Sequence, residues 1–176
     1  MIKSFLPIAL LVLVSLLTAC HKQIDTTYSV TMNCDYLVPQ STQGTLDSLE
    51  IGIPTTEVKN TCVQQGINKS QISYATVKGI HLTIDPASPQ TFASFTEMEF
   101  YLEDLKGNII KKIGESKSLN NNSKSLDIDI TLENITNLIT QDQVKIVWIA
   151  NSNKAISNSF TVHTSLDIDF TAVIYN

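Results

Sequence analysis

The fold is decided by the C-terminal stretch 160-FTVHTSLDIDFTAVI-174. Its apolar residues share one parity, which only Thr164 interrupts: Phe160, Val162, Leu166, Ile168, Phe170, Ala172 and Ile174. The other parity is mainly polar, with Thr161, His163, Asp167, Asp169 and Thr171. Because successive side chains of a strand point to opposite faces, the pattern predicts one buried and one wet face. The stretch is either one long strand or two strands joined by a bend near Thr164 and Ser165.

The same alternation recurs through the chain after residue 28. Apolar residues two positions apart occur in segments 28–32, 49–53, 80–84, 98–102, 109–113 and 126–132. Val144–Ala150 is apolar on both parities towards its end, which is typical of a central strand covered on both sides. These eight or nine strands, without regular helices between them, predict an all-β fold, an immunoglobulin-like antiparallel β-sandwich.

Two segments favour short helices. Thr56 to Gln65 follows a Thr cap and stops at Gly66, and Leu132 to Ile139 is either a short helix or a single 3₁₀ turn. No Gly/Ser-rich linker or composition break divides the chain. We therefore expect one sandwich domain over residues 28–176.

The N-terminus has the three regions of an export signal. Lys3 precedes an apolar run from Phe5 to Leu17, and small residues lead to Cys20. As a helix this run would span about 20 Å, less than the roughly 30 Å of a bilayer core. The segment 1–19 is therefore predicted to be a signal peptide rather than a permanent membrane span.

The tetrapeptide Leu17-Thr18-Ala19-Cys20 resembles the lipobox of bacterial lipoproteins. The resemblance implies cleavage before Cys20, lipidation of its thiol and acylation of the new amine, so that the protein's partner is a membrane. More than one acyl chain gives stable anchoring. Residues 20–27 are then expected to form a flexible tether. The alternative is an ordinary secretory signal followed by an incidental cysteine.

The residues around the anchor also bear on location. His21, not Asp, follows Cys20, which by resemblance to enterobacterial lipoproteins favours the outer membrane. The chain is rich in Asn, Ile and Lys, and it resembles small outer-membrane and surface lipoproteins of the Bacteroidota. Periplasmic and surface display both stay open. That resemblance makes Thr26 (in Asp25-Thr26-Thr27) and Ser48 (in Asp47-Ser48-Leu49) candidates for O-glycosylation.

The charge balance argues against nucleic acid as a partner. All twelve basic residues are Lys, against seventeen Asp and Glu; losing Lys3 leaves eleven against seventeen, a net charge of −6. Nucleic-acid binding needs clustered positive charge. The absence of Arg also removes the usual bidentate clamp for phosphate and carboxylate ligands.

Motifs for catalysis, metals or cofactors are missing. His21, His81 and His163 lie in no zinc-ligand spacing, and the two strand histidines fall on polar parity, where we expect them exposed. The pairs Asp127/Asp129 and Asp167/Asp169 could share a calcium ion or be the solvated faces of two strands. No loop with a Gly turn surrounds either pair, which favours solvated faces. The sequence therefore predicts no enzyme, no metal and no cofactor.

Two cysteines remain if Cys20 is lipidated. A Cys34–Cys62 disulfide would close a 29-residue loop and stabilise the protein by about 3.6 kcal/mol in the chain-entropy model. It would tie the first strand to the helix at 56–65. The alternative is two buried thiols that behave as small hydrophobes.

The aromatic residues allow two interpretations. Phe92, Phe95 and Phe100 either face a ligand or membrane, or cap one end of the sandwich, while Trp148 is expected in the core. The first expectation for function is a membrane-anchored, non-catalytic binding or structural module whose partner is an envelope protein or glycan. The alternatives are a lipid carrier with a pocket of these aromatics, and a hydrolase with unrecognised carboxylates.

Overall fold

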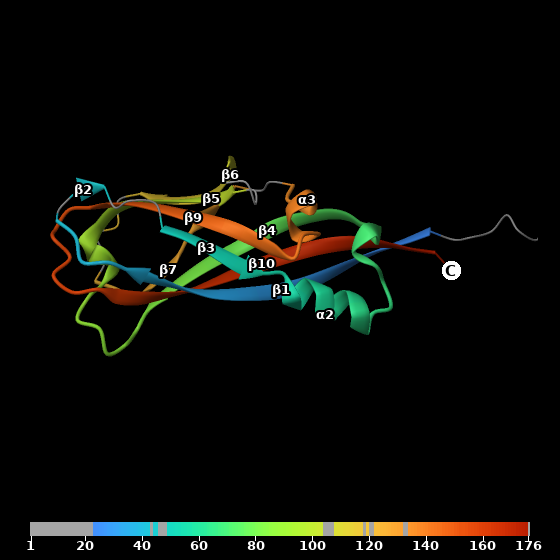
Figure 1. The fold of residues 1–176 in the computed structure, drawn as a ribbon, viewed down its shortest axis with the longest axis horizontal. Helices are drawn as coiled ribbons and strands as arrows, with labels where there is room; N and C mark the ends of the chain where they lie inside the picture. Colours follow the sequence, from blue (N-terminus) through green and yellow to red (C-terminus); the bar gives the residue numbers. More distant parts are fainter. Residues whose placement is uncertain are drawn as a thin grey trace, which may run out of the picture.

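The computed structural model of the protein describes residues 23–42, 44–45, 49–103, 108–117, 119, 122–131 and 134–175. Two antiparallel sheets pack face to face in an elongated molecule (Figure 1). One sheet has the order β1 (Gln23–Val38), β10 (Phe160–Tyr175), β4 (Ile72–Ile84) and β7 (Ser125–Asp127). The other has the order β2 (Gly44–Thr45), β9 (Gln143–Ser152), β5 (Phe95–Glu103), β6 (Ile109–Lys117) and β8 (Asp129–Ile130), with β3 (Leu49–Pro54) also paired to β9. The predicted all-β antiparallel sandwich is confirmed.

The C-terminal stretch forms one strand, β10, without a bend. It pairs with β1 along its whole length, from Gln23 opposite Tyr175 to Val38 opposite Phe160. Its apolar parity lies in the core, where Leu166 and Phe170 are fully buried. Thr164, the interruption, is 1% exposed and lies opposite Cys34, so the strand continues through it.

The predicted strand over 126–132 is divided between the two sheets. Leu126 and Asp127 pair with β4, whereas Asp129 and Ile130 pair with β6. Ile128 marks the crossing: its side chain is buried, and its backbone N–H donates to the carbonyl of Ile80. This crossing and the short β2 bring the described strands to ten, above the predicted eight or nine.

Strand β4 changes parity at a bulge. Ile80, Leu82 and Ile84 face the core at even positions, but beyond the bulge Ala75 and Val77 do so at odd positions. Asp167 pairs with Gly79 while Ile168 pairs with Val77, so Lys78 is the extra residue. The bulge therefore leaves both Lys78 and Gly79 on the outer face of the sheet, beside β10.

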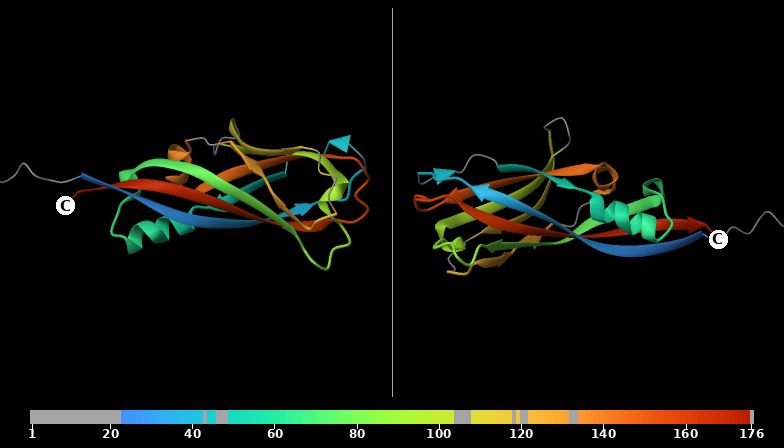
Figure 2. Two further views of the ribbon diagram at one scale, coloured as in Figure 1. Left: turned by 180° about the vertical axis from the view of Figure 1, so that it is seen from behind. Right: turned by 60° about the horizontal axis from the view of Figure 1, so that its bottom comes forward.

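The first strand corrects the predicted tether. β1 begins at Gln23, and residues 23–27 pair with residues 171–175 of β10 instead of forming a flexible linker. The last β10 residue paired with β4 is Ala172, so the two strands continue beyond the sheet as a two-stranded ribbon. Figures 1 and 2 show this ribbon at one end of the molecule, beside the C-terminus.

Two short α-helices lie beside the sandwich. α2 (Thr56–Gln64) matches the predicted helix, and Gly66 follows it with φ +67°, a left-handed conformation that glycine tolerates. α3 (Thr136–Ile139) is a single turn within the predicted 132–139 segment, whose first two residues lie outside the described ranges. Across the described residues, no helix combines the length and apolar character that a bilayer crossing needs.

Candidate binding site

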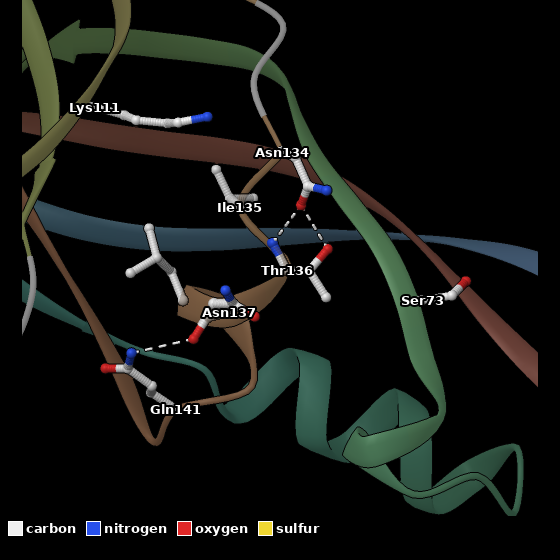
Figure 3. Close-up of a pocket in the computed structure, with 8 residues that line it drawn as sticks. Ser73, Lys111, Asn134, Ile135, Thr136, Asn137 and Gln141 are labelled. Carbon is white, nitrogen blue, oxygen red and sulfur yellow. Dashed lines mark hydrogen bonds between the residues drawn. The ribbon is translucent and has the colours of Figure 1, made fainter.

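A pocket of about 530 Å³ opens where α3 lies beside β4 and β6 (Figure 3). Its described lining consists of Ser73, Lys111, Asn134, Ile135, Thr136, Asn137, Leu138 and Gln141. Its volume falls within the range of small-ligand pockets, roughly 300–1,000 Å³. Most of these side chains end in an amide or a hydroxyl, which makes the pocket a candidate site for a polar ligand.

The backbone at the start of α3 is tied to β4. Asn134 and Thr76 form an antiparallel bridge, and the N–H of Ile135 donates to the carbonyl of Ala75 at 2.9 Å. Ile135 and Ile139 are 1% and 0% exposed and hold the turn against the core. Buried apolar anchors and a strand bridge therefore fix the pocket wall to the sheet.

Internal hydrogen bonds orient two amides of the lining. Oδ1 of Asn134 accepts from the backbone N–H of Thr136 at 3.0 Å and from its hydroxyl at 2.7 Å. This leaves Nδ2 of Asn134 as a donor with no acceptor among the described residues. On the other side, Nε2 of Gln141 donates to the carbonyl of Asn137 at 3.1 Å, which leaves Oε1 of Gln141 as an acceptor (Figure 3).

The remaining lining includes two apolar side chains, the hydroxyl of Ser73 and one cation. Ile135, the residue that caps α3, and Leu138 within α3 are largely buried. Lys111 reaches the pocket from β6, across from Asn134 (Figure 3). The described pocket thus combines amide and hydroxyl groups with an apolar surface. Sequence reasoning missed it, because its residues come from β4, β6 and the segment 134–141 and form no motif.

A second polar surface covers the outer face of β1 and β10. Five cross-strand side-chain pairs follow one another at alternate positions: Thr27–Thr171 at 3.0 Å, Ser29–Asp169 at 2.6 Å, Thr31–Asp167 at 2.6 Å, Asn33–Ser165 at 2.7 Å and Asp35–His163 at 2.7 Å. Cross-strand pairs stabilise a sheet by about 0.2–1 kcal/mol each. This row, the polar ladder, therefore supports the long β1–β10 pair.

His81 links the polar ladder to the edge strand β7. Its Nδ1 lies 2.6 Å from Asp127, and its Nε2 lies 3.1 Å from Asp167. The hydrogen bond with Asp127, supported by the one with Asp167 and by both negative charges, raises the pKa of His81 above its usual value, although partial desolvation opposes this. Gly79 leaves room for the ring, since a Cβ there would stand 2.9 Å from Nε2.

The predicted exposure of the two strand histidines is confirmed. The side chains of His81 and His163 are 49% and 50% exposed. His21 lies outside the described residues.

The two Asp pairs are either divided between the sheets or engaged by other side chains. Asp127 and Asp129 stand on different sheets. Asp167 is engaged by Thr31 and His81, and Asp169 by Ser29 and by Lys78 at 3.7 Å. Within the described ranges, no three His, Cys, Asp or Glu side chains are grouped to hold a metal ion. The solvated, hydrogen-bonded faces of amphipathic strands account for both pairs.

The predicted disulfide is not formed. Cys34 on β1 and Cys62 on α2 are free thiols, the first partly and the second fully buried. Burial raises the pKa of Cys34 to about 12, helped by the charge of Asp35 and partly offset by the hydroxyl of Thr164. Burial also raises the pKa of Cys62, although the positive charge of Lys69 opposes it. A disulfide also needs a suitable Cα separation and suitable Cβ directions, which the spacing of two cysteines in the sequence does not give.

The aromatic side chains fill the interior, so of the two interpretations for Phe92, Phe95 and Phe100 the structure supports rings that cap the core and rules out a ligand-facing patch. All three are 0% exposed, and Trp148 is 1% exposed, as expected for a core residue. Phe100 stacks on Trp148 with ring centroids 6.0 Å apart, and Phe95 packs beside it at 5.9 Å. The aromatic pocket on which a lipid-carrier function would depend is therefore occupied by these rings.

The remaining predicted sites concern modification. Thr26 lies in β1 opposite Ala172 and is partly exposed. Cys20 and Ser48 lie outside the described residues. Lipidation at Cys20 and glycosylation at Thr26 and Ser48 stay predictions.

The chain matches no family model and no curated protein sequence. Solved structures with some similarity include that of Desmodium yellow mottle tymovirus, with 12% identity, TM-score 0.36, and coverage of 90% of this chain and 93% of the other. A capsid structure of Helicobacter pylori bacteriophage KHP30 has 14% identity and TM-score 0.41, and the match covers 88% of this chain and 98% of the other. The BFDV capsid protein has 8% identity and TM-score 0.39, and the match covers 84% of this chain and 99% of the other. With every score below 0.5, the likeness carries no argument about function.

Proposed function

We propose that the protein is a lipid-anchored, non-catalytic binding module of the bacterial cell envelope, placed at the outer membrane. The observation that carries the proposal is the tetrapeptide Leu17-Thr18-Ala19-Cys20 at the end of an apolar export signal. A lipidated Cys20 would join the membrane to a domain whose first strand begins three residues later, at Gln23. Three extended residues span at most about 11 Å. The β1–β10 ribbon would then stand directly at the membrane surface.

The pocket beside α3 supports a binding role over a purely structural one. Its volume suits a small ligand, and a strand bridge to β4 fixes one of its walls. Amides and hydroxyls hold ligands by hydrogen bonds and do not ionise near neutral pH. This chemistry is that of recognition rather than catalysis.

Anchoring is tested by comparing the wild-type precursor with Cys20→Ser in a bacterial host. Wild type should take up labelled palmitate, lose residues 1–19 and fractionate with the outer membrane. Cys20→Ser should remain unlabelled and either uncleaved or soluble. Cys34→Ser is the matched control, because it makes the same chemical change at another cysteine and should keep the label. Palmitate on the Cys20→Ser protein would contradict the proposal.

A further inference from the structure

We propose that the pocket beside α3 binds a neutral, hydroxyl-rich ligand, a saccharide segment of a glycan. The inference rests on the proposed binding function and specifies its ligand class. Its starting point is the pair of oriented amides: Asn134 presents its Nδ2 donor, and Gln141 presents its Oε1 acceptor. A hydroxyl group both donates and accepts, so hydroxyls on successive rings of an oligosaccharide can pair with the two amides, which lie at opposite ends of the turn (Figure 3).

The orientation of these amides is set before any ligand arrives. Oδ1 of Asn134 is held by two hydrogen bonds from Thr136, and Nε2 of Gln141 by one to the carbonyl of Asn137. Groups that are already oriented lose less conformational freedom on binding. The same internal bonds decide which end of each amide is left for a ligand, a donor at residue 134 and an acceptor at residue 141.

A small apolar area of the lining can meet the C–H face of a sugar ring: Leu138 is 7% exposed, whereas Ile135 is 1% exposed. Ile135 and Leu138 come from the same turn as the polar groups and lie between them in sequence. A saccharide offers hydroxyls at its edge and C–H groups on its faces. An acyl chain would instead cover the amides and leave them without partners, which costs about 1–3 kcal/mol for each buried polar group. Lipid is therefore the poorer fit.

An anionic ligand also fits less well than a neutral one. Lys111 is the single cation of the described lining, and a four-residue helix is too short to provide an anion site at its N-terminus. The mature chain, with eleven Lys against seventeen acidic residues, repels anions at long range. Hydrogen bonding rather than charge is thus the main recognition force in this pocket.

The test uses the full, processed lipoprotein in detergent. Saturation-transfer NMR and calorimetry are run with neutral oligosaccharides covering α- and β-linked hexoses and N-acetylhexosamines, and with oligogalacturonate, inorganic phosphate and palmitate. Asn134→Ser deletes the donor Nδ2 but keeps an oxygen that can accept the hydrogen bonds from Thr136. Gln141→Met deletes the acceptor Oε1 and keeps a side chain of similar length. Each should weaken saccharide binding about three- to tenfold, the value of one neutral hydrogen bond.

Two matched controls keep the result specific. Asn158→Ser and Gln64→Met make the same changes at exposed positions outside the pocket and should leave binding unchanged. Thermal unfolding checks that each variant is folded; if Asn134→Ser unfolds, Gln141→Met alone decides the test.

The inference is overturned if no neutral oligosaccharide binds at millimolar concentration, or if neither pocket variant weakens binding. It is also overturned if oligogalacturonate or phosphate binds best and is lost with Lys111→Gln, or if palmitate binds best. The same ligands are also tested on Cys20→Ser, which lacks the lipidation site but keeps the pocket. Saccharide binding by this variant is measured independently of lipid anchoring, so the failure of one proposal can be told from the failure of the other.

Discussion

His81 on β4 and Asp167 on β10 are joined across the outer face of the four-stranded sheet, with Nε2 of His81 3.1 Å from Oδ2 of Asp167. The other ring nitrogen lies 2.6 Å from Asp127 on β7. Only a protonated imidazole donates from both nitrogens. The charged form of His81 therefore holds a three-residue edge strand to the centre of the sheet.

The first prediction concerns pH. The pKa of His81 is raised in the folded state by its hydrogen bond with Asp127 and, less strongly, by Asp167. A raised pKa means that the contribution to stability is fully present below the unfolded value, about 6.5, and is lost as pH rises through the folded pKa. The free energy of unfolding in urea should therefore fall over that window in wild type relative to His81→Gln.

His163→Gln is the matched control for this experiment, since His163 contacts a single carboxylate, Asp35. An NMR titration should give His81 a pKa above 6.5. A difference between wild type and His81→Gln that stays constant from pH 5 to pH 8 would show that the His81 contacts contribute no pH-dependent stability.

The second prediction concerns the close approach of strands β6 and β8. A Cβ on Gly114 would stand 2.8 Å from Cγ2 of Ile128 and 3.0 Å from the backbone oxygen of Asp129. Neither the core side chain nor the backbone can move away freely, so Gly114→Ala should destabilise the protein by about 1–3 kcal/mol.

Gly52→Ala serves as the control, because its Cβ would meet only the end of the Gln143 side chain, which can rotate. Urea unfolding measures both variants. Equal stability of the two variants would contradict a steric role for Gly114.

The strands that the sequence predicted best are those whose environment is uniform along their length. β10 keeps one buried parity from Phe160 to Ala172, and β9 is covered on both faces where Val147 and Trp148 are both buried. Two features broke this uniformity. The bulge at Lys78 shifts parity within β4, and the crossing at Ile128 moves the chain between sheets. Gly79 beside the bulge was a signal, because an isolated Gly within a strand pattern often marks a bulge, whereas the crossing at Ile128 has no Pro or Gly beside it.

The candidate site was beyond prediction for a different reason. Ser73, Lys111 and Gln141 belong to separate elements, and the topology alone brings them to one pocket. For the aromatic residues the sequence left two interpretations open, a ligand-facing patch and rings that cap one end of the sandwich, and burial decides for the second. In the structure Phe92 and Phe95 lie at the end of the core and pack against each other, with ring centroids 6.5 Å apart.

The third prediction concerns this aromatic core. Trp148 is 1% exposed and contacts Phe95, Phe100 and Tyr36, the last edge-on at 5.6 Å. Trp148→Ala should cost about 3–5 kcal/mol in the free energy of unfolding, as large cavities do. Leu37→Ala, at a side chain 66% exposed, should change stability by less than about 0.5 kcal/mol. A loss below about 1 kcal/mol for Trp148→Ala would contradict the packing described here.

The last prediction concerns the two thiols. Burial raises the pKa of Cys34 to about 12 and also raises that of Cys62, so little thiolate exists at neutral pH. Because the thiolate is the reactive form, iodoacetamide should modify both cysteines slowly in the native protein and rapidly in urea. Mass spectrometry without reductant should then find both residues alkylated in the unfolded, processed protein. The control is Val63→Cys, which places a thiol next to Cys62 on α2 at a position that is 72% exposed. This exposed thiol should react with iodoacetamide rapidly in the native state. A Cys34–Cys62 linked peptide after export would show that β1 and α2 approach more closely than the free thiols indicate.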